Sequence, residues 1–195
     1  METGLSDSVV LVTGGAGGIG ESICRAFASE GAKVIVHYHE SSYNAEKIAN
    51  EIDGFSIKAD LRDSSQALSL IDTIVDKYGK LDICIANAGY YPPESKPIWD
   101  IDIERWNQTI SSNLDVAVNT ARGFLREASR TGSGSLVFVG STAGIYGESG
   151  HSDYAAAKGA ITSGLLMSVK NDVSILGNVR AVSYTHLTLP TNVAV

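Results

Sequence analysis

Short apolar runs alternate with helix-forming segments along this 195-residue chain, and no other feature constrains its fold as strongly. Five runs stand out: VVLVT (9–13), KVIVHY (33–38), FSIKAD (55–60), LDICIAN (81–87) and SLVFVGS (135–141). Runs this short and this apolar are typical of strands buried on both faces. The clearest helix is predicted over 64–79, where apolar residues recur at the i, i+3, i+4 spacing of a single face.

This alternation predicts an α/β fold, with a doubly wound parallel sheet and helices on both of its faces. Right-handed crossovers would join the strands. In sheets of this kind, ligands gather beyond the carboxyl ends of the strands. Polar residues that directly follow the apolar runs are therefore the candidates for a functional site.

Charge and composition narrow the classes of ligand. The net charge is −7 and the pI is near 5.0, so the chain lacks the broad positive surface that attracts nucleic acid or an anionic membrane. We expect neither as a partner and favour a small molecule. The N-terminus has no basic segment followed by an apolar stretch, and no apolar run reaches the roughly 18 residues that span a bilayer. A cytoplasmic protein of one domain is expected.

The two cysteines are interpreted as part of the core. Cys24 falls in a predicted helix and Cys84 in a predicted buried strand. Small thiol side chains in such places are typical of core packing rather than of a disulfide, a nucleophile or a metal pair. No metal site is expected.

Five glycines lie between the first predicted strand and the first helix, in VVLVTGGAGGIGESICRAF (9–27). They are Gly14, Gly15, Gly17, Gly18 and Gly20, and they fit both G-x-G-x-x-G and T-G-x-x-x-G-x-G. Glycine permits a tight turn and close approach of the backbone, and the helix N-terminus offers free N–H groups to a pyrophosphate. Because the loop follows a strand and opens a helix, the motif predicts dinucleotide binding.

The residues after the second predicted strand bear on which dinucleotide is bound. A carboxylate there would bind the adenosine ribose hydroxyls of NAD and repel the extra phosphate of NADP. Tyr38 occupies this place, followed by His39 and Glu40, and no arginine or lysine stands in the loop or just after Tyr38. The missing carboxylate favours NADP, with His39 as a candidate phosphate contact, whereas Glu40 keeps NAD open.

Tyr154 and Lys158 are four residues apart in HSDYAAAKGA, so a helix would place both side chains on one face. The pair follows a predicted strand that ends at Ser141. A further strand ends in ANAG (86–89), and Asn113 lies within a predicted long helix. A Y-x-x-x-K pair alone is weak evidence, but these residues are expected to converge on the face where the glycine loop sits.

With these motifs in this order, residues from about 6 to 181 resemble the short-chain dehydrogenase/reductase family. The resemblance implies a Rossmann-type fold that binds NADP or NAD. The cofactor-binding residues that it implies are Thr13, Gly14, Gly18, Ile19, Gly20, Tyr38, His39, Asp60, Leu61, Asn87, Ala88, Gly89, Tyr154 and Lys158. The catalytic residues that it implies are Asn113, Ser141, Tyr154 and Lys158.

The mechanism that the resemblance implies agrees with the chemistry of these side chains. Tyrosine has an unperturbed pKa of about 10, which Lys158 and the positive nicotinamide ring of the oxidised cofactor are expected to lower for Tyr154. Tyr154 would then protonate the substrate carbonyl as hydride arrives, or act in reverse, while Ser141 hydrogen-bonds the same oxygen. The resemblance adds that Lys158 holds the nicotinamide ribose and that Asn113 positions a water.

The sequence leaves the substrate open. Reduction of a 3-oxoacyl group carried on acyl carrier protein is placed first, and sugar, steroid and small-alcohol dehydrogenases of the same family are alternatives. A catalytically silent dinucleotide-binding protein is a rival class, which the presence of both Tyr154 and Lys158 disfavours. The segment YYPPESKPIW (90–99) is interpreted as either a substrate wall or a rigid surface turn, and His151 as facing either substrate or solvent.

Residues 182–195 continue none of these patterns. The resemblance predicts an asparagine at position 182 and then Pro-Gly, whereas VSYTHLTLPT (182–191) resembles a translated transposon-end adapter of a sequencing library. We therefore expect a native, incomplete domain over 1–181 and a non-native tail over 182–195, with the substrate lid and the last strand missing. The full-length parent is expected to be a homotetramer or homodimer, and the shortened chain to lose activity. Sequencing of the source DNA across codon 181 tests this expectation.

Overall fold

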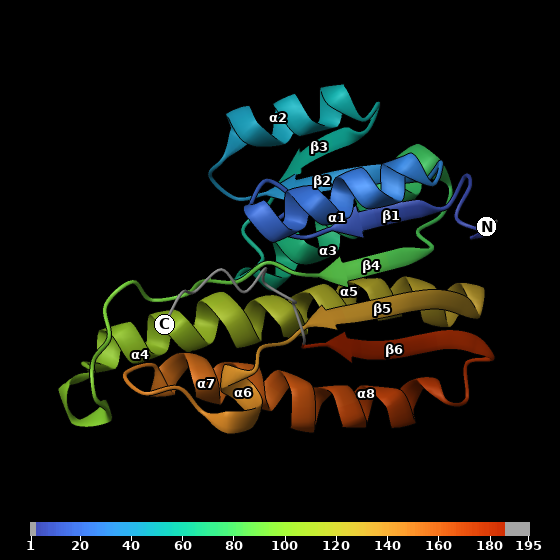
Figure 1. The fold of residues 1–195 in the computed structure, drawn as a ribbon. Coiled ribbons are helices and arrows are strands. Elements are labelled where there is room, and N and C mark those ends of the chain that lie inside the picture. Colours follow the sequence, from blue (N-terminus) through green and yellow to red (C-terminus); the bar gives the residue numbers. More distant parts are fainter. Residues whose placement is uncertain (1–2, 186–195) are drawn as a thin grey trace.

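Six parallel strands form a single sheet in the computed structural model, which describes residues 3–185 (Figure 1). The strands are β1 (Val9–Val12), β2 (Lys33–Tyr38), β3 (Phe55–Lys58), β4 (Ile83–Ala86), β5 (Ser133–Val139) and β6 (Asn178–Tyr184). Their order is β3-β2-β1-β4-β5-β6, so the direction of winding reverses between β1 and β4. In open α/β sheets, ligands bind at this reversal, beyond the carboxyl ends of the strands.

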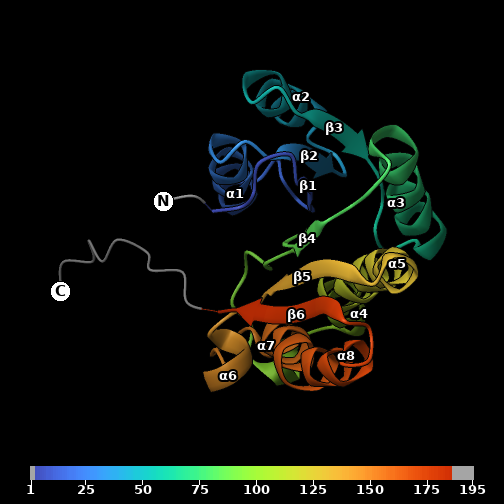
Figure 2. The same ribbon diagram turned by 90° about the vertical axis from the view of Figure 1, so that its right-hand side faces the viewer.

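Helices cover both faces of the first strands. The helical segments are α1 (Gly18–Ser29), α2 (Ser42–Glu51), α3 (Ser64–Tyr78), η1 (Ile98–Asp100), α4 (Ile103–Ile110), η2 (Ser111–Asp115), α5 (Val116–Thr131), α6 (Ala143–Tyr146), α7 (Ser152–Gly159), η3 (Ala160–Leu165) and α8 (Leu166–Val173). Helices α1 and α2 pack on one face, and α3, α5 and α8 pack on the other (Figure 2).

The core is divided between the two faces by the alternation of side chains along each strand. In β1, Val9 and Leu11 join the cluster under α3 and α5, whereas Val10 and Val12 join the cluster under α1 and α2. All four side chains are at most 1% exposed. A continuous apolar run is therefore what a strand covered on both faces requires.

The predicted fold class and the five predicted strands are confirmed, with strand ends that differ from the expectation by no more than two residues. The predicted helix over 64–79 is α3. Asp63 begins it by accepting hydrogen bonds from the backbone N–H groups of Ser65 and Gln66, and Gly79 ends it in the left-handed conformation at φ 77°.

Strand β6 is covered on one face only within the described part of the chain. Val179 and Ala181 are buried with α8, whereas Val182 and Tyr184 on the opposite face remain 51% and 53% exposed. Residues 182–184 of the expected non-native tail thus pair with β5, and Thr185 after them lines the second of two cavities described below. Residues 186–195 of that tail lie outside the described residues. The expected boundary at residue 181 stays a prediction.

Between residues 3 and 185, no helix combines the length and the apolar character that crossing a membrane requires. Nor do three or more histidine, cysteine or carboxylate side chains gather there as metal ligands would. Cys24 and Cys84 are both buried, and neither forms a disulfide.

Candidate active site

The glycine loop turns tightly from β1 into α1. Gly14 has φ 63°, a conformation that favours glycine, and a methyl group on Gly20 would collide with the carbonyl oxygen of Gly14. By contrast, a methyl group added at Gly18 would meet no atom within 4 Å. Gly20 is thus required by packing within the loop, whereas Gly18 keeps the N-terminus of α1 open.

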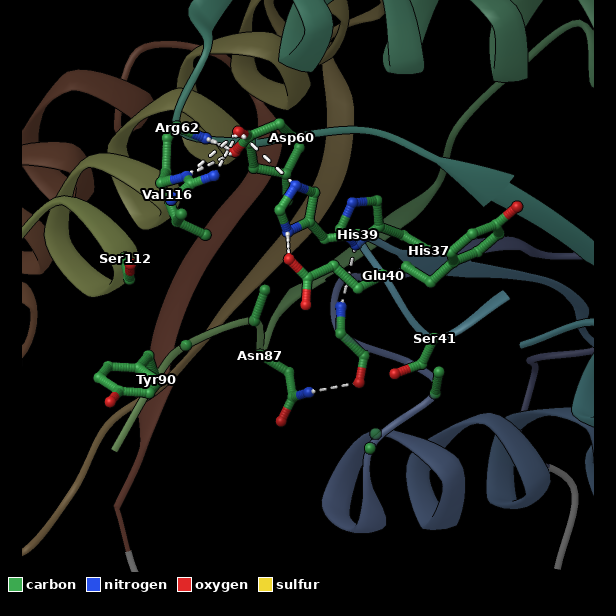
Figure 3. A pocket seen from close by; sticks show the side chains of 18 of the residues that line it. His37, His39, Glu40, Ser41, Asp60, Arg62, Asn87, Tyr90, Ser112 and Val116 are labelled. Carbon is green, nitrogen blue, oxygen red and sulfur yellow. Dashed lines mark hydrogen bonds and ion pairs between the residues drawn. The ribbon is translucent and has the colours of Figure 1, made fainter. Parts of the chain in front are cut away.

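That open space belongs to a cavity of about 770 Å³ at the reversal of winding between β1 and β4 (Figure 3). The expected residues that line it are Gly14, Gly18, Ile19, Gly20, Tyr38, His39, Asp60, Leu61, Asn87, Ala88 and Gly89. A cavity lined by the N-terminal residues of a helix, where backbone N–H groups are free to donate, suits a ligand with a pyrophosphate. The residues present therefore fit a dinucleotide.

Thr13 was expected to bind the cofactor, but it lies behind the loop and does not line the cavity. Its fully buried hydroxyl donates to the Ile85 carbonyl at 3.2 Å and accepts from the N–H groups of Asn87 and Ala88, each at 3.0 Å. The Asn87 amide in turn donates to the Thr13 carbonyl at 2.9 Å. Thr13 and Asn87 thus hold the ends of β1 and β4 together.

Arg62 lines the cavity beside His39 and Asp60, and sequence reasoning missed it. Its Nη2 donates to Asp60 Oδ2 at 2.7 Å, and the Arg62 guanidinium lowers the pKa of the Asp60 carboxyl to about 2. His39 lies between two carboxylates, with ring nitrogens 3.7 Å from Asp60 Oδ2 and 3.7 Å from Glu40 Oε1 (Figure 3). The absence of basic residues after Tyr38 therefore does not leave this part of the cavity without a cation, because the turn after β3 supplies one.

Two buried polar side chains that sequence reasoning also missed shape the cavity wall. His37 on β2 accepts the Gly14 N–H at Nδ1, 3.1 Å away, and donates from Nε2 to the Ala59 carbonyl at 3.0 Å. Asn119 on α5 donates to the Leu61 carbonyl at 2.9 Å and the Arg62 carbonyl at 3.2 Å. The only signal in the sequence was a polar residue inside an apolar strand or on a buried helix face.

The four expected catalytic residues line a second cavity of about 390 Å³, which adjoins the first. They are Asn113, Ser141, Tyr154 and Lys158. Ser141 follows β5, and its hydroxyl also accepts the Ala143 N–H at 3.2 Å, so it caps the turn into α6. These four residues were expected to converge because of their places at strand ends and on helices, and the structure brings them to one cavity.

The electrostatics around Tyr154 differ from the expectation. In the chain itself, burial raises the pKa of Tyr154, and the Ser141 hydroxyl acts in the opposite direction. Lys158 Nζ donates to the Val139 carbonyl at 2.9 Å and lies 5.8 Å from the centre of the Tyr154 ring. Burial also lowers the pKa of Lys158 to about 8. The lowered Tyr154 pKa expected from its neighbour is thus not found in the protein alone, because desolvation of both groups dominates.

Asn113 lies in η2, a π-helical turn between α4 and α5, rather than in the regular helix that was expected. Its amide donates to the carbonyls of Tyr90 at 2.8 Å and Thr109 at 2.9 Å, and its Oδ1 accepts the Tyr90 N–H at 3.2 Å. A methyl group on Gly89 would come within 2.7 Å of Asn113 Oδ1 and 3.6 Å of Lys158 Nζ. The wider turn and the missing side chain at Gly89 bring Asn113 to the cavity.

The aromatic segment 90–99 after β4 was interpreted as either a substrate wall or a surface turn, and each interpretation fits a different part of it. Tyr90 and Tyr91 line the second cavity, as a substrate wall would, whereas Trp99 is 82% exposed on the surface. His151 faces neither open solvent nor the cavity directly. It is 6% exposed, and its ring stacks on that of Tyr91 with 4.5 Å between the centroids.

Comparisons with known proteins agree with this geometry. A sequence model of the family described as short chain dehydrogenase matches residues 8–190. The chain is 31% identical over 172 residues to a 3-oxoacyl-[acyl-carrier-protein] reductase FabG of Staphylococcus aureus, covering 86% of this chain and 69% of that protein. It is 32% identical over 162 residues to the protein of the same name from Thermotoga maritima, covering 80% and 65%.

A relative that is named for a different activity is about equally similar. The chain is 29% identical over 168 residues to a cis-4-hydroxycyclohexanecarboxylate dehydrogenase of Sinomonas cyclohexanicum, which covers 84% of this chain and 66% of that protein. The chain thus spans about two thirds of the length of the curated relatives it matches. From the match over residues 8–190, the chain belongs to the short-chain dehydrogenase family of enzymes.

Proposed function

We propose that the protein interconverts a carbonyl and an alcohol with a nicotinamide dinucleotide, and that Ser141, Tyr154 and Lys158 carry the reaction. One observation supports this most directly: the two cavities share part of their walls. Ile19, Asn87, Gly89 and Tyr90 line both. A dinucleotide that lies along the glycine loop would therefore end beside the side chains able to handle a proton.

A bound nicotinamide dinucleotide would supply the hydride chemistry. In the proposal, the Tyr154 hydroxyl gives a proton to the substrate oxygen or takes one from it, and Ser141 donates a hydrogen bond to the same oxygen. Lys158, when protonated, stabilises the phenolate of Tyr154. Asn113, fixed by Tyr90 and Thr109, positions a water for proton exchange.

We favour NADP over NAD as the cofactor. Tyr38 replaces the carboxylate that would repel a 2′-phosphate, and His39 lines the same end of the cavity. Arg62 adds a positive charge there, although Asp60 pairs with it, and Glu40 keeps NAD as the alternative. Titration of the protein with NADPH and with NADH, followed by nicotinamide fluorescence, tests the order of affinities. Tighter binding of NADH would reverse the preference.

We place 3-oxoacyl thioesters first among the substrates, because two of the relatives are named for reduction of that group. A small cyclic alcohol is the second candidate. It is favoured by the relative named for a hydroxycyclohexane acid and by the two tyrosines that line the second cavity.

The experiment that tests the function is oxidation of NADPH or NADH by the full-length parent in the presence of a 3-oxoacyl thioester or a cyclic ketone. Replacement of the general acid or of its lysine, as Tyr154→Phe or Lys158→Met, is expected to lower kcat by about a hundredfold or more. Tyr43→Phe on α2 is the matched control, because this tyrosine is 78% exposed and lies outside both cavities. Turnover that survives Tyr154→Phe would refute the assigned chemistry.

We further propose a cytoplasmic location and assembly of the full-length parent as a homotetramer or homodimer, with neither nucleic acid nor membrane as a partner. The acidic charge of −7 supports the absence of a nucleic-acid partner. Sedimentation velocity at several protein concentrations tests the assembly. A monomer at all concentrations would contradict it.

A further inference from the structure

The side chain of Tyr91 lies between Glu148 and Tyr154, the proposed general acid, and contacts both. The Tyr91 hydroxyl donates to Glu148 Oε1 at 2.6 Å. The Tyr91 ring meets the Tyr154 ring edge to face, with 5.0 Å between the centroids and 83° between the planes. Tyr91 thus connects a carboxylate at the surface with a reacting residue of the cavity.

The position of Tyr91 is fixed by a buried neighbour. The His151 ring stacks on Tyr91 at an interplanar angle of 20°. His151 Nε2 donates to the Pro92 carbonyl at 3.1 Å, and its Nδ1 lies 3.4 Å from the Tyr91 hydroxyl and 3.8 Å from Glu148 Oε1. Because the histidine is buried and anchored, Tyr91 and Glu148 are held against it rather than free to swing away.

The negative charge of Glu148 affects the pKa values of two tyrosines that line the second cavity. It raises the pKa of Tyr91 to about 12, and it contributes to the raised pKa of Tyr154. The other charged groups near Tyr154 are Lys158, bound to the Val139 carbonyl, and Asp153, paired with Arg105. Glu148 is therefore the carboxylate on this wall of the described structure that has no arginine or lysine beside it.

We propose that Glu148 is a specificity-determining residue, whose negative charge at the Tyr91 wall selects uncharged carbonyl or alcohol substrates over anionic ones. This inference rests on the proposed function. Glu148 is an exposed residue that does not itself line the second cavity, but it accepts the hydrogen bond of Tyr91, which does. A substrate carboxylate against the Tyr91 wall would face this negative charge across one side chain, and water and salt would screen part of the repulsion. Repulsion of this kind discriminates between substrates even where shape does not.

The inference separates the two substrate candidates. The reacting end of a 3-oxoacyl thioester carries no charge, so Glu148 does not oppose it. A hydroxycyclohexane or oxocyclohexane carboxylate brings a negative charge within a few bonds of its reacting carbon and is disfavoured. Aromatic walls at Tyr90 and Tyr91 still accept an apolar chain or an uncharged ring.

The first test measures the coupling without any turnover. The phenolate of Tyr154 is titrated by ultraviolet absorbance in the wild type and in Glu148→Gln, each after subtraction of its Tyr154→Phe counterpart. Loss of the carboxylate is expected to lower the titration midpoint of Tyr154. Equal midpoints would show that Glu148 does not act on the cavity and would overturn the inference.

The second test measures selection, with cyclohexanone and 4-oxocyclohexanecarboxylate as a neutral and anionic pair of one shape. Glu148→Gln is expected to raise the anionic-to-neutral ratio of kcat/KM about tenfold, and added salt to raise it in the wild type. Glu46→Gln on α2, an exposed residue outside both cavities, changes net charge equally and is expected to leave the ratio unchanged. An unchanged ratio in Glu148→Gln would overturn the substrate class.

The two tests together distinguish failure of the proposed function from failure of the role that we give to Glu148. Turnover is measured with the full-length parent, because the shortened chain is expected to lose activity. Absence of turnover of any ketone or thioester by that protein would count against the proposed function, and with it against the substrate class. The titration would still decide the coupling of Glu148 to Tyr154. Turnover with an unshifted midpoint and an unshifted ratio would leave the proposed function standing and reject the role of Glu148.

Discussion

The carboxylate of Asp153, next to Tyr154 in the chain, is fully buried and accepts a hydrogen bond from Arg105 Nε at 2.9 Å. Thr109 donates to the same carboxylate at 2.9 Å, and the Tyr154 N–H donates to it at 3.0 Å. Arg105 also donates to the Glu94 carbonyl at 2.8 Å. One ion pair thus joins α4, the loop after β4 and the start of α7, on which Tyr154 sits.

Breaking this pair is expected to destabilise the fold. Arg105→Met leaves a buried carboxylate without its cation, which costs about 3–5 kcal/mol in comparable proteins. Although burial by itself raises the pKa of Asp153, hydrogen bonds from Arg105 and Thr109 outweigh it and hold the pKa below its usual range. The pair therefore stabilises the fold above the unfolded pKa of Asp153, and this contribution is lost as pH falls through the folded pKa.

Urea denaturation near neutral pH measures the loss. The control is Arg122→Met, because Arg122 is an exposed arginine on α5. Arg105→Lys is expected to recover part of the stability, since it keeps the charge but not the two-pronged geometry. If Arg105→Met unfolded at the same urea concentration as Arg122→Met, the pair would not stabilise the native state.

Two glycines of the same loop are expected to respond differently to alanine. Gly20→Ala brings a methyl group into collision with the Gly14 carbonyl, so we expect lower stability together with weaker cofactor binding. Gly18→Ala meets no protein atom within 4 Å, and its methyl projects at the open N-terminus of α1. We therefore expect Gly18→Ala to retain near wild-type stability and lose affinity for NADPH.

Thermal unfolding and NADPH fluorescence titration separate the two effects. The helix propensity of alanine exceeds that of glycine by up to about 1 kcal/mol, so Gly18→Ala can even gain stability slightly. Equal NADPH affinity in Gly18→Ala and the wild type would mean that the cofactor does not approach this helix end.

Residue patterns predicted the frame of the site because that frame depends on backbone direction. Parallel strands bring their carboxyl ends to one edge, so Asn87 and Ser141 had to follow β4 and β5 on the same side. Helix periodicity then placed Tyr154 and Lys158 on one face of α7. None of these predictions depends on contacts between side chains of different elements.

The features that sequence reasoning missed are contacts between side chains of elements far apart in the chain. Arg105 and Asp153 are 48 residues apart on two helices, and no local pattern indicates that they meet. Arg62 reaches the cavity from the turn after β3, far along the chain from the glycine loop and from the residues that directly follow Tyr38. The raised pKa of Tyr154 likewise depends on burial, which only packing determines.

His37 is expected to make the fold sensitive to mild acid. Burial lowers its pKa from 6.5 to about 4. Because the unfolded chain binds the proton more readily, stability is retained above pH 6.5 and falls between pH 6.5 and about 4, by an amount on the order of 3 kcal/mol. His37→Gln, which cannot take up that proton, is expected to lose less stability over this range. Urea denaturation at several pH values checks this, with His39→Gln as a control; parallel loss in His37→Gln would reject it.

Lys158 is expected to produce a second pH window of the same sign, at alkaline pH. Burial lowers its pKa from 10.5 to about 8, so the folded chain releases the proton first and the unfolded chain binds more protons between these values. The free energy of unfolding contributed by Lys158 therefore rises as pH increases from about 8 to 10.5, by roughly 3 kcal/mol. Lys158→Met carries no such cost at neutral pH, because methionine has no charge to bury.

The measurement is the difference in unfolding free energy between the wild type and Lys158→Met across this pH range. The contributions of the other titrating groups are the same in both proteins and cancel in this difference. We expect Lys158→Met to be the more stable protein at neutral pH and its advantage to shrink as pH rises, even though it loses the hydrogen bond to the Val139 carbonyl. A difference that does not change with pH would mean that Lys158 is charged in the folded protein at no cost. The positive charge proposed to stabilise the Tyr154 phenolate would then persist in the folded protein through the range from about pH 8 to 10.5, in which we expect it to be lost.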